Sequence, residues 1–505
     1  MRIKNSITNF ISGLTLRLTT ILLNFVARTI FINILGTSYL GVNGLLMNVL
    51  SMLSLAELGI GTAINFSLYK PLADKDDKKI AVLMQFYKRA YQIIGVVVFL
   101  VGLILMLFLD VIIKDPGEVE NLKLIFFIYL INTSYSYFMT YKGTLITADQ
   151  RGYLLTKANV VFNVVTIVSQ VLVLIVTRNY IAYLLANMVC LFIQRLYINR
   201  KVTELYPVLK EKSTEKLPKE ELSVIIKNVK AMVFHKIGDY CINGTDNIII
   251  STFISVTMVG VYSNYLMIIS MVNGIIVMFF NSLTASMGNL IATENKGRKL
   301  EVFEIINFIA FWLFGFATVA FYNLLNPFIE IWLGAEFLLP QSILVVILIN
   351  YYLTGMRVPV HTVKAAAGLY DEDKYTPIIQ SIVNLGLSII LVQKLGLVGV
   401  FIGTLVSSLI LPCWQRPYIV YKYVFKKSIK QYFTKYLSYL TVILLNTFGI
   451  EYFFNLHLKD YTIGNFILKV VIIAIIPNLI ILLIFFKTTE FKEILSIGRK
   501  FLKRG

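Results

Sequence analysis

Residues 8–35, TNFISGLTLRLTTILLNFVARTIFINIL, form an apolar run long enough to cross a membrane, yet the run carries two arginines, Arg17 and Arg28. A helix needs about twenty apolar residues to span the hydrocarbon core. A charge at the bilayer centre costs roughly 2.5–3.5 kcal/mol on insertion scales, so it is expected to face a wet cavity or a partner. Arg17, which lies about ten residues into the run, is therefore a candidate functional residue.

The same arrangement returns later in the chain. At an offset of 219 residues, Arg17 aligns with Lys236, which lies at a similar depth in the apolar run 223–253. Without a gap, this offset also pairs further identical residues: Asn9 with Asn228, Asn24 with Asn243, Gly41 and Val42 with Gly260 and Val261, and Ser51 and Met52 with Ser270 and Met271. Such a repeat predicts two related halves, each with a cation at membrane depth. We interpret the pair as part of a central site for a negatively charged group.

The composition excludes a soluble globular domain. Of 505 residues, 57% are hydrophobic and 15% charged, and the mean hydropathy is +0.75. The apolar runs lack the two-residue alternation of a barrel, so they predict helices. We expect an all-α polytopic membrane protein with about fourteen transmembrane helices, arranged as two parallel, pseudo-symmetric six-helix lobes plus two C-terminal helices.

The charged loops predict the domain limits and the topology. We expect an N-lobe at 1–199, a cytoplasmic linker at 200–222, a C-lobe at 223–421, and two final helices with a basic tail at 422–505. Most of the 47 Lys and Arg residues then fall on one side, which predicts that both termini are cytoplasmic. The net charge of +19 reflects this topology and contact with membrane lipids, and does not indicate a nucleic-acid partner.

Catalytic and metal-binding patterns are missing from the sequence. The three cysteines and three histidines are scattered, without metal-ligand spacing or a nucleophile motif. A membrane-embedded polymerase, ligase or acyltransferase is therefore disfavoured, and we expect neither an enzyme nor a cofactor.

Six segments carry a resemblance to a known family. They are LGTSYLGVNGL at 35–45, LSLAELG at 53–59, SLYKPLA at 67–73, AGLY at 367–370, VNL at 383–385 and LGLVGVFIGT at 395–404. Their order and spacing resemble the bacterial polysaccharide repeat-unit flippases, the oligosaccharide flippase or polysaccharide biosynthesis protein family. That family belongs to the multidrug/oligosaccharidyl-lipid/polysaccharide exporter (MOP) superfamily, together with the multidrug and toxic-compound extrusion (MATE) transporters.

The resemblance implies a MATE-like fold in a bacterial cytoplasmic membrane, with alternating access around a cationic cavity. It also implies a polyprenyl-diphosphate-linked oligosaccharide as substrate, exported for capsule, O-antigen or exopolysaccharide synthesis, with the polysaccharide polymerase machinery as a partner. The related lipid II flippases carry further arginines in their second and eighth spans. This sequence has no Arg or Lys in the centres of those spans, so that cationic triad is not carried over.

Four cations within the predicted spans are the candidate substrate-binding residues: Arg17, Arg28, Lys236 and Arg357. Arg17 and Arg28 are eleven residues apart, so they project from nearly the same helix face, about 16 Å apart along the axis. Guanidinium groups form forked hydrogen bonds with phosphate oxygens, which suits a diphosphate. Alternatively, Arg28 lies near the outer interface and extends its charge into water.

Arg357 lies two residues before Pro359, which removes a backbone hydrogen bond and favours a bend. With His361 and Lys364 it forms a basic stripe on one helix face. In the alternative interpretation, His361 and Lys364 only approach the cytoplasmic interface. Tyrosines at five positions either stack on sugar rings or pack between helices: Tyr135, Tyr137, Tyr141, Tyr351 and Tyr352.

Three carboxylates are candidates for binding a coupling ion, Na⁺ or H⁺, or for pairing with the cations: Glu57, Asp239 and Asp246. Asp239 and Asp246 share a helix stripe with Lys236. Either an aspartate binds the ion while Lys236 binds phosphate, or Lys236 and Asp239 pair so that a polar helix can insert. Glu57 either binds a cation or neutralises an arginine of the first span.

A MATE-type multidrug or cation antiporter is the alternative function, because its fold is the same. An exporter of organic cations is expected to have an acidic cavity. The charges within the predicted spans are mixed and include several cations. This pattern favours an anionic, lipid-linked sugar over a cationic drug.

Overall fold

The computed structural model describes residues 20–53, 60–113, 115–149, 151–210, 244–369, 371–459 and 462–502, with short stretches at 217–220, 222–223 and 225–226. Every regular element in these residues is helical, which confirms the expected all-α class. Eleven of the described helices are long and apolar enough to cross a membrane. The total of about fourteen stays a prediction, because parts of the expected first, second and seventh spans lie outside the described residues.

The chain divides into two compact units, Met1–Ser263 and Asn264–Gly505. The first unit ends beyond the predicted linker at 200–222, because the segment 246–263 packs on helix α2 of the same unit. The predicted lobe limits themselves stay a prediction.

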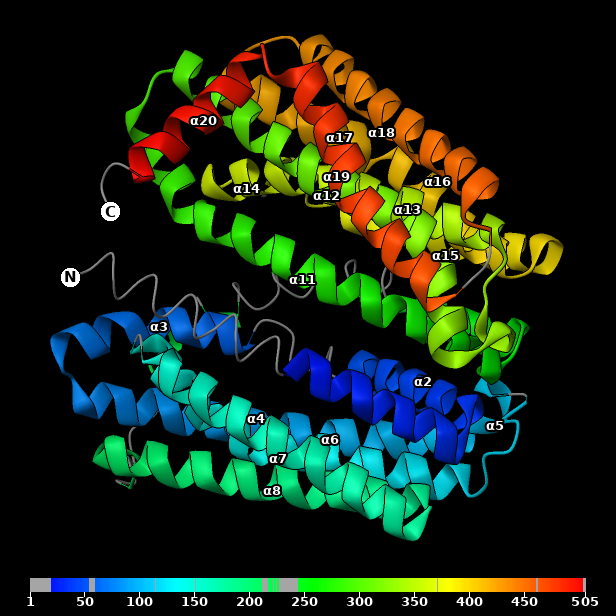
Figure 1. The fold of residues 1–505 in the computed structure, drawn as a ribbon. Helices are drawn as coiled ribbons and strands as arrows, with labels where there is room; N and C mark the ends of the chain where they lie inside the picture. The colour runs from blue at the N-terminus through cyan, green and yellow to red at the C-terminus, as the bar shows by residue number, and fades with distance from the viewer. Residues whose placement is uncertain are drawn as a thin grey trace. The chain divides into compact units, whose positions relative to one another are not determined.

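The first unit is a bundle of long apolar helices. Its elements are the helix Thr20–Leu35, α2 (Thr37–Leu53), α3 (Ile60–Asp74), α4 (Asp77–Leu107), α5 (Leu109–Ile112), α6 (Leu122–Ala148), α7 (Gly152–Thr177), α8 (Tyr180–Leu205), the 3-10 turn η2 (Pro207–Lys210), α10 (Asp246–Phe253) and the start of α11 (Val256–Thr293). Helices α4 and α6, α6 and α8, and α7 and α8 lie side by side (Figure 1). Small residues allow this close packing in a membrane: a Cβ atom at Gly102 of α4 would overlap the Leu130 side chain of α6.

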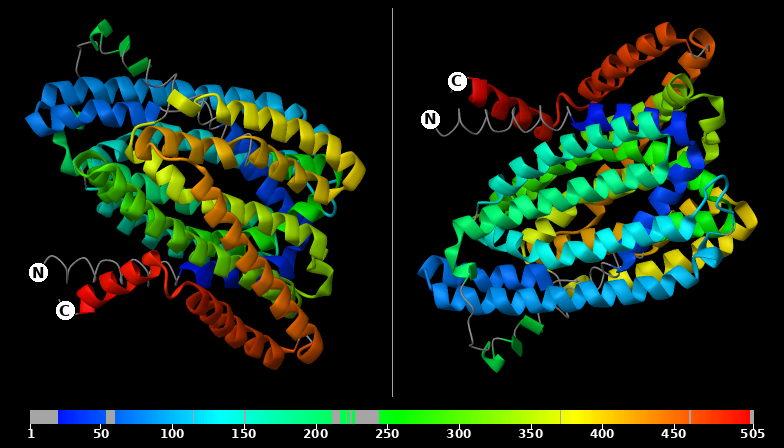
Figure 2. Two further views of the ribbon diagram at one scale, coloured as in Figure 1. Left: turned by 90° about the horizontal axis from the view of Figure 1, so that it is seen from above. Right: turned by 90° about the horizontal axis from the view of Figure 1, so that it is seen from below.

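The second unit contains the remaining helices. They are α12 (Lys296–Leu333), η3 (Ala335–Phe337), α13 (Gln341–Met356), α14 (Val358–Ala366), η4 (Asp371–Asp373), α15 (Thr376–Leu395), α16 (Leu397–Ile410), α17 (Pro412–Val420), the π-turn η5 (Tyr421–Phe425), α18 (Lys430–His457), α19 (Ile463–Phe485) and α20 (Thr489–Leu502). Figure 2 shows α20 set at an angle to α19.

The sequence segments 383–385 and 395–404 build a helical hairpin from α15 and α16. Gly396 makes the turn between the two helices with a φ of 60°, a conformation that glycine adopts without strain. Across the hairpin, Asn384 Nδ2 donates to Thr404 Oγ1 at 2.9 Å, and Ser388 Oγ donates to the Val400 carbonyl at 3.0 Å. Hydrogen bonds of this kind hold neighbouring helices together in a membrane.

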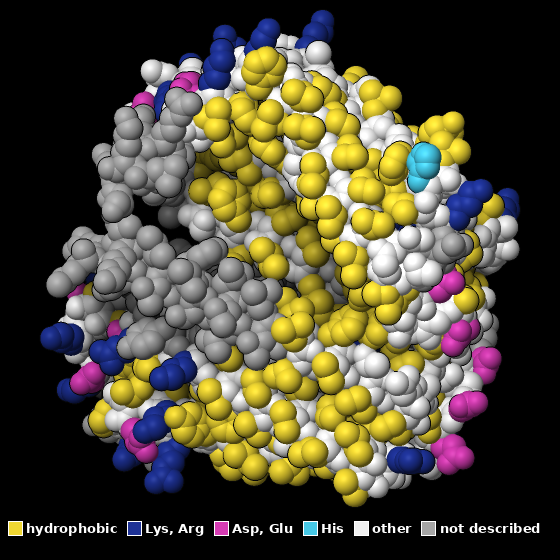
Figure 3. Space-filling model, in the orientation of Figure 1, with side chains coloured by type: hydrophobic (Ala, Val, Ile, Leu, Met, Phe, Trp, Pro, Cys, Tyr) yellow, Lys and Arg dark blue, Asp and Glu magenta, His cyan; other side chains and the backbone are white. Residues whose placement is uncertain are grey.

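The surface is that of a membrane protein. Large apolar side chains such as Leu107, Val176 and Ile382 are exposed along the long helices. Figure 3 shows hydrophobic side chains over most of the visible face, with Lys, Arg, Asp and Glu gathered towards its margins. Exposed apolar surface on this scale is expected where lipid tails replace water.

Candidate functional site

Four of the predicted site residues lie outside the described residues. They are Arg17, Glu57, Lys236 and Asp239. Their placement is therefore untested, and so is the expected equivalence of Arg17 and Lys236. Arg28, Asp246 and Arg357 are described. Arg28 and Asp246 belong to the first unit, and Arg357 belongs to the second.

Arg28 lies half-buried on the helix Thr20–Leu35, one turn before Ile32. Its Nη2 atom donates to Ser263 Oγ at 2.5 Å, and this hydroxyl in turn donates to the Gly260 carbonyl at 2.7 Å. The Ser263 hydroxyl holds one end of the guanidinium, which is positively charged because arginine does not lose its proton in proteins. A charge-assisted hydrogen bond is about twice as strong as a neutral one, so it orients the side chain.

The position of Ser263 follows from the packing of α11 on α2. A Cβ atom at Gly41 of α2 would overlap the Val256 carbonyl at the start of α11. Only glycine permits so close an approach of two helix backbones. The first two turns of α11, including Ser263, are thereby brought within reach of Arg28.

Four tyrosines form a connected group that begins beside Arg28. Tyr183 lies close enough to Arg28 to interact with it electrostatically. Tyr180 stacks on Tyr183 at a ring distance of 6.0 Å, and Tyr39 contacts Tyr180 at 5.1 Å. Tyr129 extends the cluster, since its hydroxyl lies 3.3 Å from that of Tyr180. We call Arg28, Tyr39, Tyr129, Tyr180 and Tyr183 the Arg28 cluster.

The predicted tyrosines are not the ones that lie at Arg28. Tyr137, Tyr141, Tyr351 and Tyr352 are buried, as in the packing interpretation, and Tyr135 donates to Met139 Sδ at 3.1 Å. The sequence contained one signal for the tyrosines that lie near Arg28. Tyr180 and Tyr183 stand three residues apart at the start of an apolar run, and residues three apart share a helix face. Their proximity to Arg28 depends on helix packing, which that spacing does not contain.

Asp246 begins α10, and one of its carboxylate oxygens is enclosed. Within the described residues, this Oδ1 atom accepts no hydrogen bond. Tyr262 lies near enough to interact with it electrostatically. An enclosed carboxylate oxygen is costly unless a proton or cation occupies it, which is the chemistry expected of an ion-coupling residue.

Arg357 lies at a break in the tenth predicted span. Helix α13 ends at Met356, and α14 begins at Val358 with Pro359 in its first turn. Nη2 of Arg357 donates to Thr354 Oγ1 at 3.0 Å, and Nη1 donates to Cys413 Sγ at 3.3 Å. Both of these partners are neutral and leave the positive charge of Arg357 in place.

The basic stripe beyond Arg357 is divided in the structure. Lys364 is buried and forms an ion pair with Asp373, which Arg416 Nε also approaches at 3.5 Å. His361 is exposed. Lys364 is therefore part of a structural ion cluster that joins α14, η4 and α17. Its amine is therefore paired with a carboxylate of the same unit.

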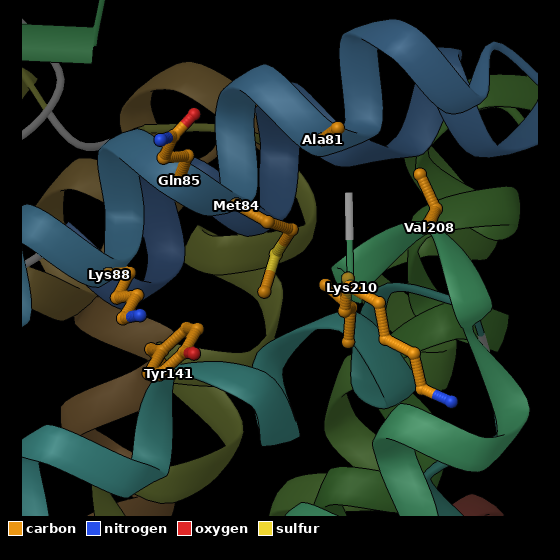
Figure 4. A pocket seen from close by; sticks show the side chains of 8 residues that line it. Ala81, Met84, Gln85, Lys88, Tyr141, Val208 and Lys210 are labelled. Atoms are coloured by element: carbon orange, nitrogen blue, oxygen red, sulfur yellow. The ribbon is translucent and has the colours of Figure 1, made fainter. Parts of the chain in front are cut away.

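A separate basic cavity of about 220 Å³ lies between α4, α6 and η2 in the first unit, and its lining includes Gln85, Lys88, Tyr141 and Lys210. Figure 4 shows the Lys88 amine directed towards Tyr141, whereas the Lys210 amine points away from it. The two cations do not converge on one point, so this cavity is a weaker anion site than the Arg28 cluster.

These features define a helical membrane protein with a MATE-like fold. The structure is similar to an inward-facing multidrug resistance MATE family transporter of the MOP superfamily, with a TM-score of 0.61 and 16% identity over 80% of this chain and 98% of that chain. It is also similar to the lipid II flippase MurJ in an inward closed conformation, with a TM-score of 0.65 and 15% identity over 94% of this chain and 99% of that chain.

A further structural neighbour is a MOP superfamily transporter from Pyrococcus furiosus, whose binding pocket is described as reversed in polarity. It has a TM-score of 0.53 and 16% identity over 82% of this chain and 94% of that chain. No family model matches the sequence, and no curated protein does. At these low identities the likeness establishes the shared fold.

Proposed function

We propose that this chain is a flippase that moves polyprenyl-diphosphate-linked oligosaccharide repeat units from the inner to the outer leaflet of a bacterial cytoplasmic membrane by alternating access. The exported units would supply capsule, O-antigen or exopolysaccharide synthesis, next to the polysaccharide polymerase machinery. In this proposal both termini are cytoplasmic. Arg17, Arg28, Lys236 and Arg357 contact the diphosphate during its passage.

The observation that carries the proposal is the Arg28 cluster. Arginine keeps its positive charge in proteins, and its planar guanidinium matches the oxygens of a phosphate, so Arg28 beside Ser263 suits a diphosphate. Tyr39 and Tyr183 are half-buried and offer aromatic rings that suit a sugar, whereas Tyr180 is buried and packs against both. A cation beside such rings fits a lipid-linked oligosaccharide better than an organic cation.

A MATE-type cation antiporter remains the second candidate function. It is favoured by one observation, the enclosed carboxylate oxygen of Asp246. In the flippase proposal, Asp246 instead binds a coupling Na⁺ or H⁺, together with Glu57 or Asp239. Each function thus assigns Asp246 a cation, but only the flippase requires Arg28.

Purified protein in sealed vesicles tests this requirement. The vesicles carry a fluorescent polyprenyl-diphosphate oligosaccharide, and a membrane-impermeant glycosidase reports its transfer across the bilayer. We expect Arg28→Ala to slow transfer about tenfold or more, Arg28→Lys to retain part of it, and Arg200→Ala, which loses an exposed surface charge, to transfer normally.

The same vesicles loaded with a cationic dye test the antiporter. Dye transport that survives Arg28→Ala, with no transfer of the oligosaccharide by the unmodified protein, would contradict the flippase. Transfer of the oligosaccharide at an equal rate by Arg28→Ala would contradict the role of the Arg28 cluster.

A further inference from the structure

The connection between α17 and α18 gathers three lysines around one cavity in the second unit. Lys422, Lys426 and Lys427 line a space of about 400 Å³ together with Tyr421 and Ser428. No carboxylate is part of this lining. All three lysines are exposed. Within the described residues, none of their amines takes part in an ion pair.

The backbone accounts for this concentration of charge. The helix widens into the π-turn Tyr421–Phe425 and then ends at Lys426, which has a left-handed φ of 54°. Both Lys426 N and Lys427 N donate to the Tyr421 carbonyl, so the chain folds back on itself there. π-turns and left-handed non-glycine residues are uncommon and occur often at functional sites. Here they direct successive lysines to the rim of one cavity.

An exposed stripe leads from the apolar surface to this cavity. Ile410, Trp414, Tyr418 and Lys422 are spaced by four residues, and the three apolar or aromatic side chains are each about half exposed. The Lys422 amine lies 5.5 Å from the centre of the Tyr418 ring. Aliphatic, then aromatic, then cationic side chains are the order found from the hydrocarbon core to the headgroups of a bilayer.

We propose that this surface is a binding site for an anionic phospholipid, with the phosphate at Lys422, Lys426 and Lys427 and the acyl chains along Trp414 and Ile410. The charge complements a phosphodiester, and the apolar stripe excludes a soluble phosphate as the preferred occupant. The site lies in the second unit and does not depend on the proposed transport function.

Trp414 allows a local test, since the chain has three tryptophans. A variant with Trp312→Phe and Trp332→Phe leaves Trp414 as the reporter in nanodiscs. We expect brominated phosphatidylglycerol to quench its fluorescence at about tenfold lower mole fraction than brominated phosphatidylcholine. The triple change Lys422→Gln, Lys426→Gln, Lys427→Gln is expected to remove this preference, and the corresponding triple change to arginine is expected to keep it.

A matched control removes the same charge elsewhere, by Lys75→Gln in the turn after α3 and Lys78→Gln and Lys79→Gln at the start of α4, and is expected to keep the preference. The proposal is overturned if the two glutamine triples behave alike, or if the unmodified protein is quenched equally by both lipids. Millimolar inorganic phosphate is expected to leave quenching unchanged. If it displaces the brominated lipid, the site binds free phosphate and the lipid assignment is wrong.

Discussion

The hydroxyl oxygens of Ser38 and Thr257 lie 3.2 Å apart, and the two residues are separated by 219 positions, the interval of the sequence repeat. The contacts beside them are related by the same interval. A Cβ atom at Gly41 would overlap the Val256 carbonyl, and one at Gly260 would overlap the Thr37 carbonyl. The start of α2 and the start of α11 therefore cross around a local pseudo-two-fold axis that passes between Ser38 and Thr257.

Because the two helices cross so closely, we predict that very small substitutions at the crossing strongly lower the stability of the protein. Gly41→Ala and Gly260→Ala each place a methyl group against a backbone carbonyl, which cannot move as a side chain can. We expect each variant to lose about 1–3 kcal/mol of stability through overpacking. The matched control is Gly288→Ala on α11, where nothing lies within 4 Å and alanine is expected to be neutral or to stabilise the helix. Thermal melting in detergent measures the difference, and equal melting temperatures for all three variants would refute the close crossing.

Because the Ser263 hydroxyl holds Arg28, we predict that removing this hydroxyl lowers transport and leaves the fold intact. Ser263→Ala removes the acceptor at 2.5 Å, and the guanidinium loses this contact. Hydrogen bonds to charged groups contribute about 1.5–3 kcal/mol, so the transfer rate in vesicles is expected to fall about tenfold. Ser263→Thr keeps a hydroxyl and is expected to be active. Ser282→Ala, which loses an exposed hydroxyl, serves as the control. A Ser263→Ala protein with full activity would show that this contact is not needed.

Lys364, Asp373 and Arg416 form an ion cluster. We predict that the stability of the fold depends strongly on the central carboxylate of this cluster, that of Asp373. Asp373→Asn removes the carboxylate that pairs with the buried Lys364 amine, and removing one partner of a buried pair costs about 3–5 kcal/mol. The double variant Lys364→Met, Asp373→Leu is expected to recover part of this loss, because it removes the Lys364–Asp373 pair while Arg416 stays in place. Thermal unfolding measures both. A double variant that is less stable than Asp373→Asn would mean that the charges themselves stabilise the fold.

We predict that the packing of α20 against the other helices of the second unit depends on pH. Burial alone raises the pKa of Glu490, but hydrogen bonds from Lys435, from its own backbone N–H and from Thr488 outweigh it, so the pKa lies below the ordinary value of 4.5. A carboxylate with a depressed pKa stabilises the folded state above its unfolded pKa, and this contribution is lost as pH falls through the folded value. We expect α20 to remain attached at neutral pH and to detach as the pH falls below about 4.5.

The Trp312 ring, which stacks on Phe491 of α20 at 6.0 Å, provides the measurement. In a variant with Trp332→Phe and Trp414→Phe, its emission is expected to shift to longer wavelength on acidification. Glu490→Gln is expected to show the acid-like emission already at neutral pH. An identical titration in both proteins would assign the shift to another group.

Composition and the length of the apolar runs were enough to predict the helical class and the membrane environment. Long apolar runs can satisfy their backbone in lipid only as helices, so composition and run length suffice for that conclusion. The break at Arg357 followed from Pro359 for an equally local reason, since proline has no N–H to donate. The repeat was visible because its identities need no gap, and the contact between Ser38 and Thr257 agrees with it.

Packing between helices determines which side chains come into contact. In the sequence, Lys364 is one member of a basic stripe. In the structure it pairs with Asp373, nine residues further along the chain. Arg28 was a candidate on its own helix, but its partners Ser263 and Tyr183 come from distant segments. Helical spacing specifies a face and a depth along one helix, whereas the neighbour that fills that face depends on close approaches such as Gly41 on Val256. Those approaches depend on packing between helices, which periodicity along a single chain does not encode.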